Sequence, residues 1–115
     1  QLHPTVIAEV GRDADLVMKE TFGPCAPVLT VDSIEDAVAY VNSADCGLQA
    51  GVFTKDMDKA FFAAERLQVG AVIFNNGPQF DSPFIPFGGV KKSGLGREGV
   101  RYAIEEMTTV KTLVF

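Results

Sequence analysis

The sequence predicts an α/β domain built on an open, largely parallel sheet with crossover helices. Runs of β-branched residues alternate with segments of helical periodicity, which is the pattern of βαβ units. The run at residues 71–74 is apolar without alternation, as expected of a strand that is covered on both faces. A glycine-rich segment at residues 85–99 then interrupts the alternation, and long irregular segments inside a domain are usually functional.

The first half of the chain predicts two strands and two helices. Residues 5–10 form a β-branched run closed by glycine, and residues 27–31 form a second run. Between them Asp13 is expected to cap a short helix with a weakly apolar face, formed by Ala14, Val17, Met18 and Thr21. Asp32 and Glu35 form the capping box of the next helix. Its apolar face consists of Ile34, Ala37, Val38 and Val41.

The second half continues the alternation and ends on a helix and a strand. Residues 48–53 predict a third strand, and Asp56 caps a helix that ends before Gly70. The apolar face of that helix consists of Met57, Ala60, Phe61, Ala64 and Leu67. Residues 71–74 are the fourth strand, and the strands run parallel because helices connect them through right-handed crossovers. A last helix has Val100, Ala103, Ile104 and Met107 on one face, and a final strand runs from Thr109 to Phe115.

Composition and charge narrow the class of protein. With 47% hydrophobic and 22% charged residues in 115, the chain is expected to fold as one domain with a modest core. A net charge of -5 without a basic cluster argues against a nucleic acid partner. No apolar run has the length of a membrane span and no signal peptide is visible, so a soluble cytoplasmic protein is expected. Because a strand-like run begins almost directly after Gln1, we expect a processed or truncated chain.

The chain contains the residue pattern of a dinucleotide-binding motif but not the structural context that the motif requires. Residues 94–99 match GxGxxG and open a helix. A true fingerprint follows a buried strand and is followed about 20 residues later by an acidic residue, and neither condition holds here. Leu95 stands where a P-loop needs its lysine. The segment is therefore not interpreted as a phosphate-binding loop.

The cysteines and the single histidine do not form a catalytic or metal site. Cys25 and Cys46 have no metal-ligand spacing and are too few for a disulfide framework. A reactive thiol needs a nearby cation, base or helix N-terminus. Cys25 instead follows a proline and precedes an apolar strand, so we expect both cysteines to be structural. His3 lies near the terminus and is expected to be solvated, which leaves no residue of this chain as catalytic.

Glu20 has two readings that the residues alone leave open. It is either an exposed acid at the end of a helix, or a carboxylate that accepts hydrogen bonds from ligand hydroxyls while Phe22 packs on a flat ring. An acid at a helix C-terminus is disfavoured by the helix dipole, so its placement is unusual.

The loop at residues 75–96 is the better candidate for the wall of a ligand site than the segment around Glu20, because it leaves the carboxyl end of a strand.

Three sequence blocks resemble the aldehyde dehydrogenase superfamily in order and approximate spacing. They are KETFGP at residues 19–24, GLQAGVFT at residues 47–54 and PFGGVKKSGLGRE at residues 86–98. The resemblance covers essentially the whole chain. It is strongest to the branch that acts on lactaldehyde or, without phosphorolysis, on glyceraldehyde 3-phosphate.

The resemblance implies a role for four residues. Members of this superfamily oxidise an aldehyde through a cysteine thiohemiacetal, with hydride transfer to NAD or NADP and hydrolysis of the resulting thioester. Glu20 matches the glutamate that binds the nicotinamide-ribose hydroxyls, and Phe22 matches the aromatic residue beside the nicotinamide. Phe87 matches a wall of the substrate tunnel, and Phe80 is a second candidate for that wall. The nucleophile, the water-activating glutamate and the cofactor-binding domain lie upstream in the superfamily and are absent from these residues.

The resemblance also implies a division of the chain. Residues 1–107 correspond to the C-terminal part of the catalytic domain, and residues 108–115 to an oligomerisation strand. The partners expected are a small aldehyde, the rest of the enzyme chain and further copies of the protein, bound through the strand from Thr109 to Phe115. The alternative is a stand-alone, non-catalytic α/β module for assembly or small-ligand binding.

Overall fold

The computed structural model describes all residues 1–115, and the chain divides into two compact units. The first unit comprises Gln1–Ala37 and the second Val38–Phe115, so the boundary falls within helix α2 (Ile34–Ser43). None of the helices has the length and apolar content that crossing a bilayer requires.

The first unit contains a two-stranded parallel ladder and one short helix. Strand β1 (Thr5–Ala8) pairs with β2 (Cys25–Val28), and helix α1 (Asp15–Met18) connects them. This is the βαβ arrangement that the alternation of residues predicts. The bidentate ion pair of Arg12 with Asp36 joins the β1–α1 connection to the first turn of α2.

Three predictions for the first unit are wrong in detail. Asp13 does not cap α1, because the Ala14 amide donates to the Gly11 carbonyl and Asp13 lies inside the resulting turn. The second strand begins two residues earlier than predicted and ends at Val28, because the Thr5 amide donates to the Pro24 carbonyl and sets the register. The first strand ends at Ala8 and not at residue 10, because the backbone turns at Glu9, whose φ is 56°. Residues 29–31 therefore have no strand to pair with.

The cap of α2 is also displaced by one residue. Ser33, not Asp32, accepts a hydrogen bond from the amide of Asp36, at 3.1 Å. The predicted apolar face is otherwise correct. Val38 is buried and Ile34 and Ala37 are half-buried, whereas Val41 is exposed.

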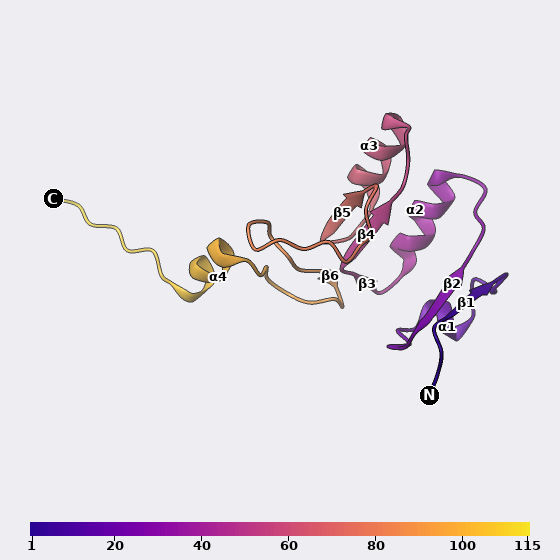
Figure 1. The fold of residues 1–115 in the computed structure, drawn as a ribbon. Coiled ribbons are helices and arrows are strands. Elements are labelled where there is room, and N and C mark those ends of the chain that lie inside the picture. The colour runs from indigo at the N-terminus through magenta and orange to yellow at the C-terminus, as the bar shows by residue number, and fades with distance from the viewer. The chain divides into compact units, whose positions relative to one another are not determined.

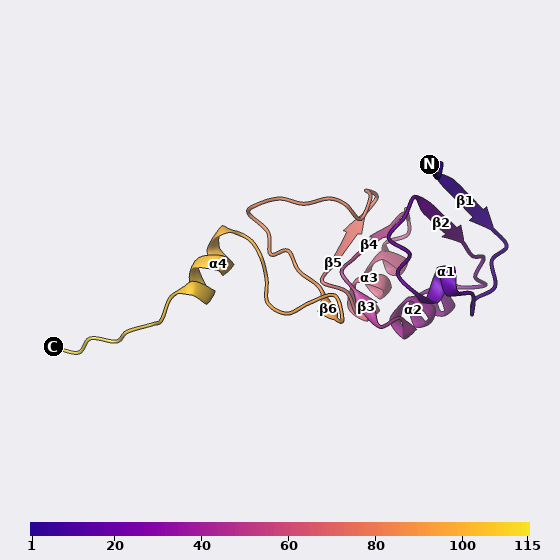
Figure 2. The ribbon, with the colours of Figure 1, turned by 90° about the horizontal axis from the view of Figure 1, so that it is seen from below.

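The second unit is organised around a parallel ladder of β4 (Gln49–Val52) and β5 (Ala71–Phe74). Helix α3 (Met57–Arg66) connects these strands and lies against them in both views (Figures 1 and 2). The predicted cap is confirmed, because the Asp56 carboxylate accepts hydrogen bonds from the amides of Asp58 and Lys59 at 3.0 and 3.3 Å. The predicted apolar face is partly wrong: Ala63 is the buried position, and Phe61 and Ala64 are exposed.

An antiparallel pair that the sequence does not predict completes the second unit. Strand β3 (Cys46–Gly47) pairs with β6 (Val90–Lys91), which lies within the glycine-rich segment. The strands thus form three separate two-stranded ladders, two of them parallel, instead of one continuous sheet. The fold is an α/β fragment with parallel sheets, as expected for an incomplete domain.

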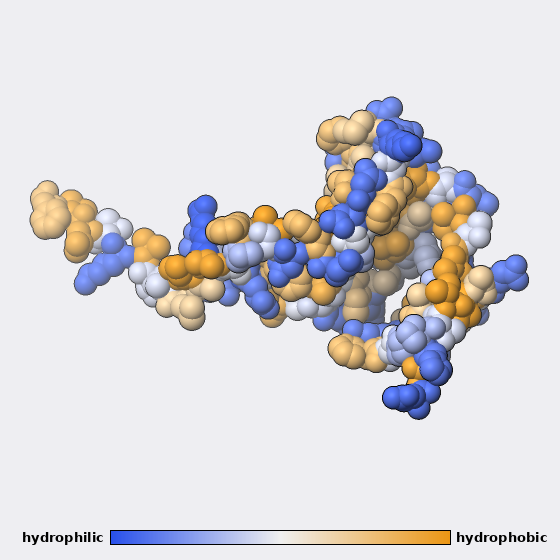
Figure 3. Space-filling view, in the orientation of Figure 1, coloured by the Kyte–Doolittle hydropathy of each residue, from blue (hydrophilic) through white to orange (hydrophobic).

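The C-terminal part consists of helix α4 (Val100–Met107) and an irregular tail. The helix is present as predicted, but most of its predicted apolar face is exposed. Residues 109–115 have no ladder partner within the chain, so their assignment as a strand stays a prediction. Figure 3 shows apolar atoms along the surface of this region, and Val110, Val114 and Phe115 are almost fully exposed.

The chain has very little core of its own. Only Val38 and Ala63 are buried among the hydrophobic residues, and no large side chain is fully buried. The exposed aromatic side chains include Phe22, Phe53, Phe61, Phe84 and Phe115. A core of this size contributes little hydrophobic stabilisation, and large apolar side chains stay exposed on both units.

Candidate functional site

The first group of predicted site residues lies in the connection between α1 and β2. Glu20 is exposed and makes no hydrogen bond or ion pair within the chain. The neighbouring cation does not engage it, because Lys19 Nζ pairs with Asp15 Oδ2 at 3.0 Å. The carboxylate of Glu20 is therefore free to accept hydrogen bonds from a ligand.

Phe22 is held in an unusual backbone conformation two residues further on. Its φ is 47°, in the left-handed region that bulky residues rarely adopt, and its side chain is 94% exposed. The following residues are fixed, since the Cys25 amide donates to the Gly23 carbonyl and the Thr5 amide to the Pro24 carbonyl. Backbone strain of this kind costs about 1–3 kcal/mol and concentrates at ligand sites.

The predicted loop wall of the second unit leaves the carboxyl end of β5, as expected, and then folds back across β4. At its start, Asn75 Oδ1 accepts a hydrogen bond from the Thr54 amide at 2.9 Å. The loop then covers Gly51, because a Cβ there would lie 3.0 Å from the Asn76 carbonyl oxygen and 3.2 Å from Pro78 Cδ. Gln49 Nε2 donates to the Phe80 carbonyl at 3.1 Å. Phe80, half-exposed, is thus placed over the start of β4.

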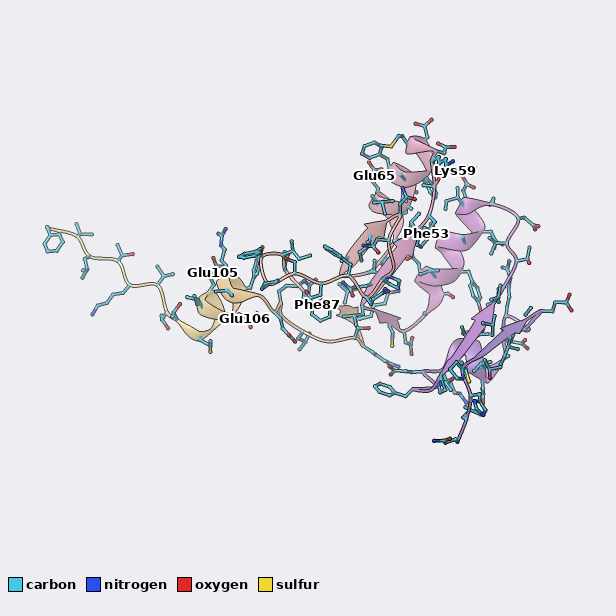
Figure 4. The ribbon with its side chains drawn as sticks, in the orientation of Figure 1. Phe53, Lys59, Glu65, Phe87, Glu105 and Glu106 are labelled. Carbon is cyan, nitrogen blue, oxygen red and sulfur yellow. The ribbon has the colours of Figure 1, made fainter.

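Phe87 lies where the glycine-rich segment begins. Its amide donates to the Glu98 carbonyl at 3.1 Å, and the Glu98 amide donates back to the Phe87 carbonyl at 2.6 Å. The residue is half-buried. Figure 4 shows Phe87 in the irregular segment, with Glu105 and Glu106 on α4 beyond it. No ring contact joins Phe87 to Phe80.

Lysine side chains fasten the same segment to the end of α2. Lys91 Nζ donates to the carbonyls of Asn42 and Ala44, at 2.7 and 3.0 Å, where the helix leaves carbonyl groups without partners. Lys92 forms an ion pair with Asp45. The hydrogen bond from Lys92 lowers the pKa of Asp45, and the carboxylate in turn raises the pKa of Lys92. Two adjacent lysines therefore anchor the segment to the end of α2 and the residues that follow it.

Sequence reasoning missed these anchors. Lys91, Ser93 and Arg97 hold backbone groups of the second unit: Ser93 Oγ accepts from the Gly47 amide at 2.8 Å, and Arg97 donates to two carbonyls. The available signal was the run of glycines itself. Glycine contributes no side-chain partner, so its backbone groups need donors and acceptors from elsewhere.

The two cysteines differ in environment. Cys25 is half-buried in β2, which agrees with a structural role, whereas Cys46 is exposed on β3. Neither thiol makes a hydrogen bond. No group of three His, Cys, Asp or Glu side chains is arranged to hold a metal ion.

An open hollow of about 340 Å³ lies at the junction of the glycine-rich segment and α4. It is lined by Gly96, Arg97, Tyr102, Glu105 and Glu106. None of the four predicted site residues contributes to it. Glu20 and Phe22 belong to the first unit, and Phe80 and Phe87 to the second, so the structure describes two partial groups.

Comparison with known proteins identifies the class to which these features belong. The model of the aldehyde dehydrogenase family matches residues 1–113. The chain belongs to the aldehyde dehydrogenase family. This agrees with the three sequence blocks that carry Glu20, Gly47 and Phe87.

Curated relatives include lactaldehyde dehydrogenases and a sulfoacetaldehyde dehydrogenase. A lactaldehyde dehydrogenase of Methanococcus maripaludis is 49% identical over 113 residues, which are 98% of this chain and 24% of that protein. The sulfoacetaldehyde dehydrogenase of Neptuniibacter caesariensis is 42% identical, over 98% of this chain and 25% of its own length. The chain thus spans about a quarter of the length of the curated relatives that it matches.

Solved structures give the same class. The glyceraldehyde-3-phosphate dehydrogenase GapN of Methanocaldococcus jannaschii, complexed with NADP, superimposes with a TM-score of 0.90 and 44% identity. The match covers 96% of this chain and 24% of that one. Aldehyde dehydrogenase 21 of Physcomitrella patens, in complex with the reaction product succinate, has a TM-score of 0.85 and 43% identity, over 90% of this chain and 22% of that one.

Proposed function

We propose that this chain is part of an NAD(P)-dependent aldehyde dehydrogenase that oxidises an aldehyde to a carboxylic acid. The aldehyde would be held as a thiohemiacetal on a cysteine elsewhere in the protein, and hydrolysis of the thioester would release the acid. The cofactor, when bound, accepts the hydride. This chain contributes contacts to both reactants and no nucleophile.

The observation that carries the proposal is the state of Glu20 and Phe22. A free carboxylate and a strained, exposed aromatic ring stand two residues apart on an anchored segment. A carboxylate is an acceptor for the paired hydroxyls of a ribose, and an exposed ring offers a flat apolar face to a nicotinamide. Glu20 therefore binds the nicotinamide ribose, and Phe22 packs beside the nicotinamide ring.

Phe80 and Phe87 supply the substrate side. Both lie on a loop that leaves the carboxyl end of β5, and the backbone of each is fixed by hydrogen bonds to another part of the second unit. Aromatic walls on a fixed backbone suit a small, partly apolar substrate. The names of the relatives favour a small aldehyde such as lactaldehyde, and the solved structures with NADP or NAD favour either cofactor.

The rest of the proposal concerns assembly. Residues 1–107 complete a catalytic domain whose other parts cover the exposed apolar surfaces, and residues 108–115 pair with the sheet of another copy. The near absence of a core argues against a self-sufficient module. Two free thiols suit the reducing conditions of the cytoplasm, which we take as the location.

The test uses the full-length protein that contains this chain. Purified protein is mixed with NAD or NADP and a panel of small aldehydes, and reduced cofactor is followed by absorbance. We expect turnover with at least one aldehyde, and Phe22→Ala should raise the KM for the cofactor roughly tenfold, because a ring contact of about 1–1.5 kcal/mol is lost. Phe61→Ala is the control, since Phe61 is also exposed but lies on helix α3. Absence of reduced cofactor with every aldehyde would contradict the proposal.

A further inference from the structure

We propose that Arg97 is a positioning residue for the aldehyde site. Its guanidinium cross-links the two sides of the glycine segment, residues 86–98, and thereby holds Phe87 in place. This inference depends on the proposed function, because it assumes that Phe87 lines the path of the aldehyde. It assigns to Arg97 a role that acts through the backbone and involves no contact with the substrate.

Arg97 bridges two distant parts of the glycine segment with one nitrogen. Nη1 donates to the Gly89 carbonyl at 2.9 Å and to the Gly96 carbonyl at 2.7 Å. Both N–H groups of Nη1 are thus used, and both bonds are charge-assisted, which makes them stronger than neutral ones. The side chain consequently ties residue 89 to residue 96 across the segment.

The bridge lies next to the pair that holds Phe87. Phe87 and Glu98 exchange two backbone hydrogen bonds at the base of the segment. Gly89 follows Phe87 by two residues, and Gly96 precedes Glu98 by two. Arg97 therefore adds a second cross-link between the two sides of this loop. It lies two residues nearer the tip of the loop than the backbone pair of Phe87 and Glu98.

Losing the hydrogen bonds from Arg97 would leave a buried backbone carbonyl without a partner. Gly89 is buried, so removal of the guanidinium leaves its carbonyl without the hydrogen bond that Arg97 supplies. Gly88 leaves room for the arginine stem, because a Cβ at Gly88 would lie 3.1 Å from Arg97 Cδ. Without the arginine, the segment has to rearrange to satisfy the Gly89 carbonyl, and Phe87 is only two residues away.

The experiment uses the full-length protein and three variants. Arg97→Met removes the donors and keeps an unbranched stem, and Arg97→Lys retains a donor without the planar fork. Arg101→Met is the matched control, because Arg101 is exposed on α4, pairs only with Glu105 and changes the charge by the same amount. For each, kcat and KM are measured with aldehydes of increasing chain length, together with hydrogen exchange of peptides that cover residues 86–98.

We expect Arg97→Met to raise the aldehyde KM roughly tenfold and to change the preferred chain length, because small displacements of a positioned wall have large kinetic effects. The KM for the cofactor should not change, and exchange should accelerate in the glycine segment alone. Arg97→Lys should recover part of both effects, and Arg101→Met should behave as the wild type. In a double-mutant cycle with Phe87→Ala, the effects on chain-length preference should be strongly non-additive.

Two results would overturn the inference while leaving aldehyde oxidation intact. One is an Arg97→Met variant whose preferred aldehyde chain length and hydrogen exchange in residues 86–98 equal those of the wild type. The other is that the effects of Arg97→Met and Phe87→Ala on chain-length preference add. If Arg97→Met does not fold, Arg97→Lys decides the question by the same two readouts. A wild-type protein that oxidises no aldehyde would refute the proposed function and this inference with it.

Discussion

Gly70 and Gly88 approach each other so closely that a Cβ atom on Gly70 would lie 1.6 Å from the carbonyl oxygen of Gly88. Gly70 directly precedes β5, and its amide donates to the Leu48 carbonyl at 2.9 Å. Gly88 directly follows Phe87. The contact therefore seats the glycine segment against the start of the β4–β5 ladder, with Phe87 at its edge.

Replacing Gly70 by alanine should destabilise the full-length protein. All three nearest atoms belong to the backbone of Gly88 and Leu48, so the backbone has to move, and overpacking of this kind costs about 1–3 kcal/mol or more. The thermal midpoint of unfolding measures the effect. Gly23→Ala is the control, because a Cβ there meets only Thr21 at 3.8 Å. Equal midpoints for the two variants would mean that this contact is not formed.

Local signals predicted the cap of α3 and the strand β5 of the second unit correctly. The Asp56 cap and the apolar run of β5 act over a few residues, so both are visible in the sequence. The errors arise where a residue distant in the sequence determines the local structure. The hydrogen bond from the Thr5 amide to the Pro24 carbonyl sets where β2 begins, and the pairing of β3 with β6 joins residues more than 40 positions apart.

The sequence proposes residues for the candidate site but does not predict which interactions hold them in place. Glu20 and Phe87 were found through the resemblance of short blocks to a family. Arg97 was not, because its role consists of hydrogen bonds to carbonyls of glycines, which carry no side-chain pattern. Nor does the sequence indicate the left-handed conformation of Phe22, since an aromatic residue is an unfavourable choice for it.

The ion pair of Arg12 with Asp36 should make stability depend on pH at acidic values. The hydrogen bonds from Arg12 hold the pKa of Asp36 below its ordinary value of 3.8. A depressed carboxyl pKa contributes stability above the unfolded-state value, which is lost as the pH falls through the folded-state value. Thermal midpoints of wild type and Arg12→Gln should therefore differ near neutral pH and converge below about pH 4. Lys55→Gln, in which an unpaired lysine is removed, should show no such convergence. A constant difference between wild type and Arg12→Gln at all pH values would contradict the expected linkage.

Deleting residues 109–115 should disrupt the assembly. Val110, Val114 and Phe115 are almost fully exposed, and no strand within the chain pairs with this segment. If the segment adds to the sheet of another copy, the truncated full-length protein should be monomeric or aggregated. Light scattering coupled to size exclusion measures this directly. An unchanged oligomeric mass would show that the tail does not form the interface.

The 115-residue chain by itself should not oxidise aldehydes. Neither of its thiols makes a hydrogen bond that could orient it. Unfolding should be broad because only two hydrophobic residues are buried. Reduced cofactor is assayed with the purified chain and the aldehyde panel. Turnover that is lost on substitution of Cys25 or Cys46 would show that the chain contains a nucleophile after all.

The most direct test of the central claim is the rate of hydride transfer in full-length Glu20→Gln. A charge-assisted hydrogen bond is worth about 1.5–3 kcal/mol, so loss of the carboxylate should slow single-turnover reduction of the cofactor by up to about a hundredfold. The thermal midpoint should stay unchanged, because Glu20 has no partner within the chain. A slow single turnover with an intact fold is the result that we predict, and reduction at the wild-type rate would show that Glu20 does not bind the cofactor.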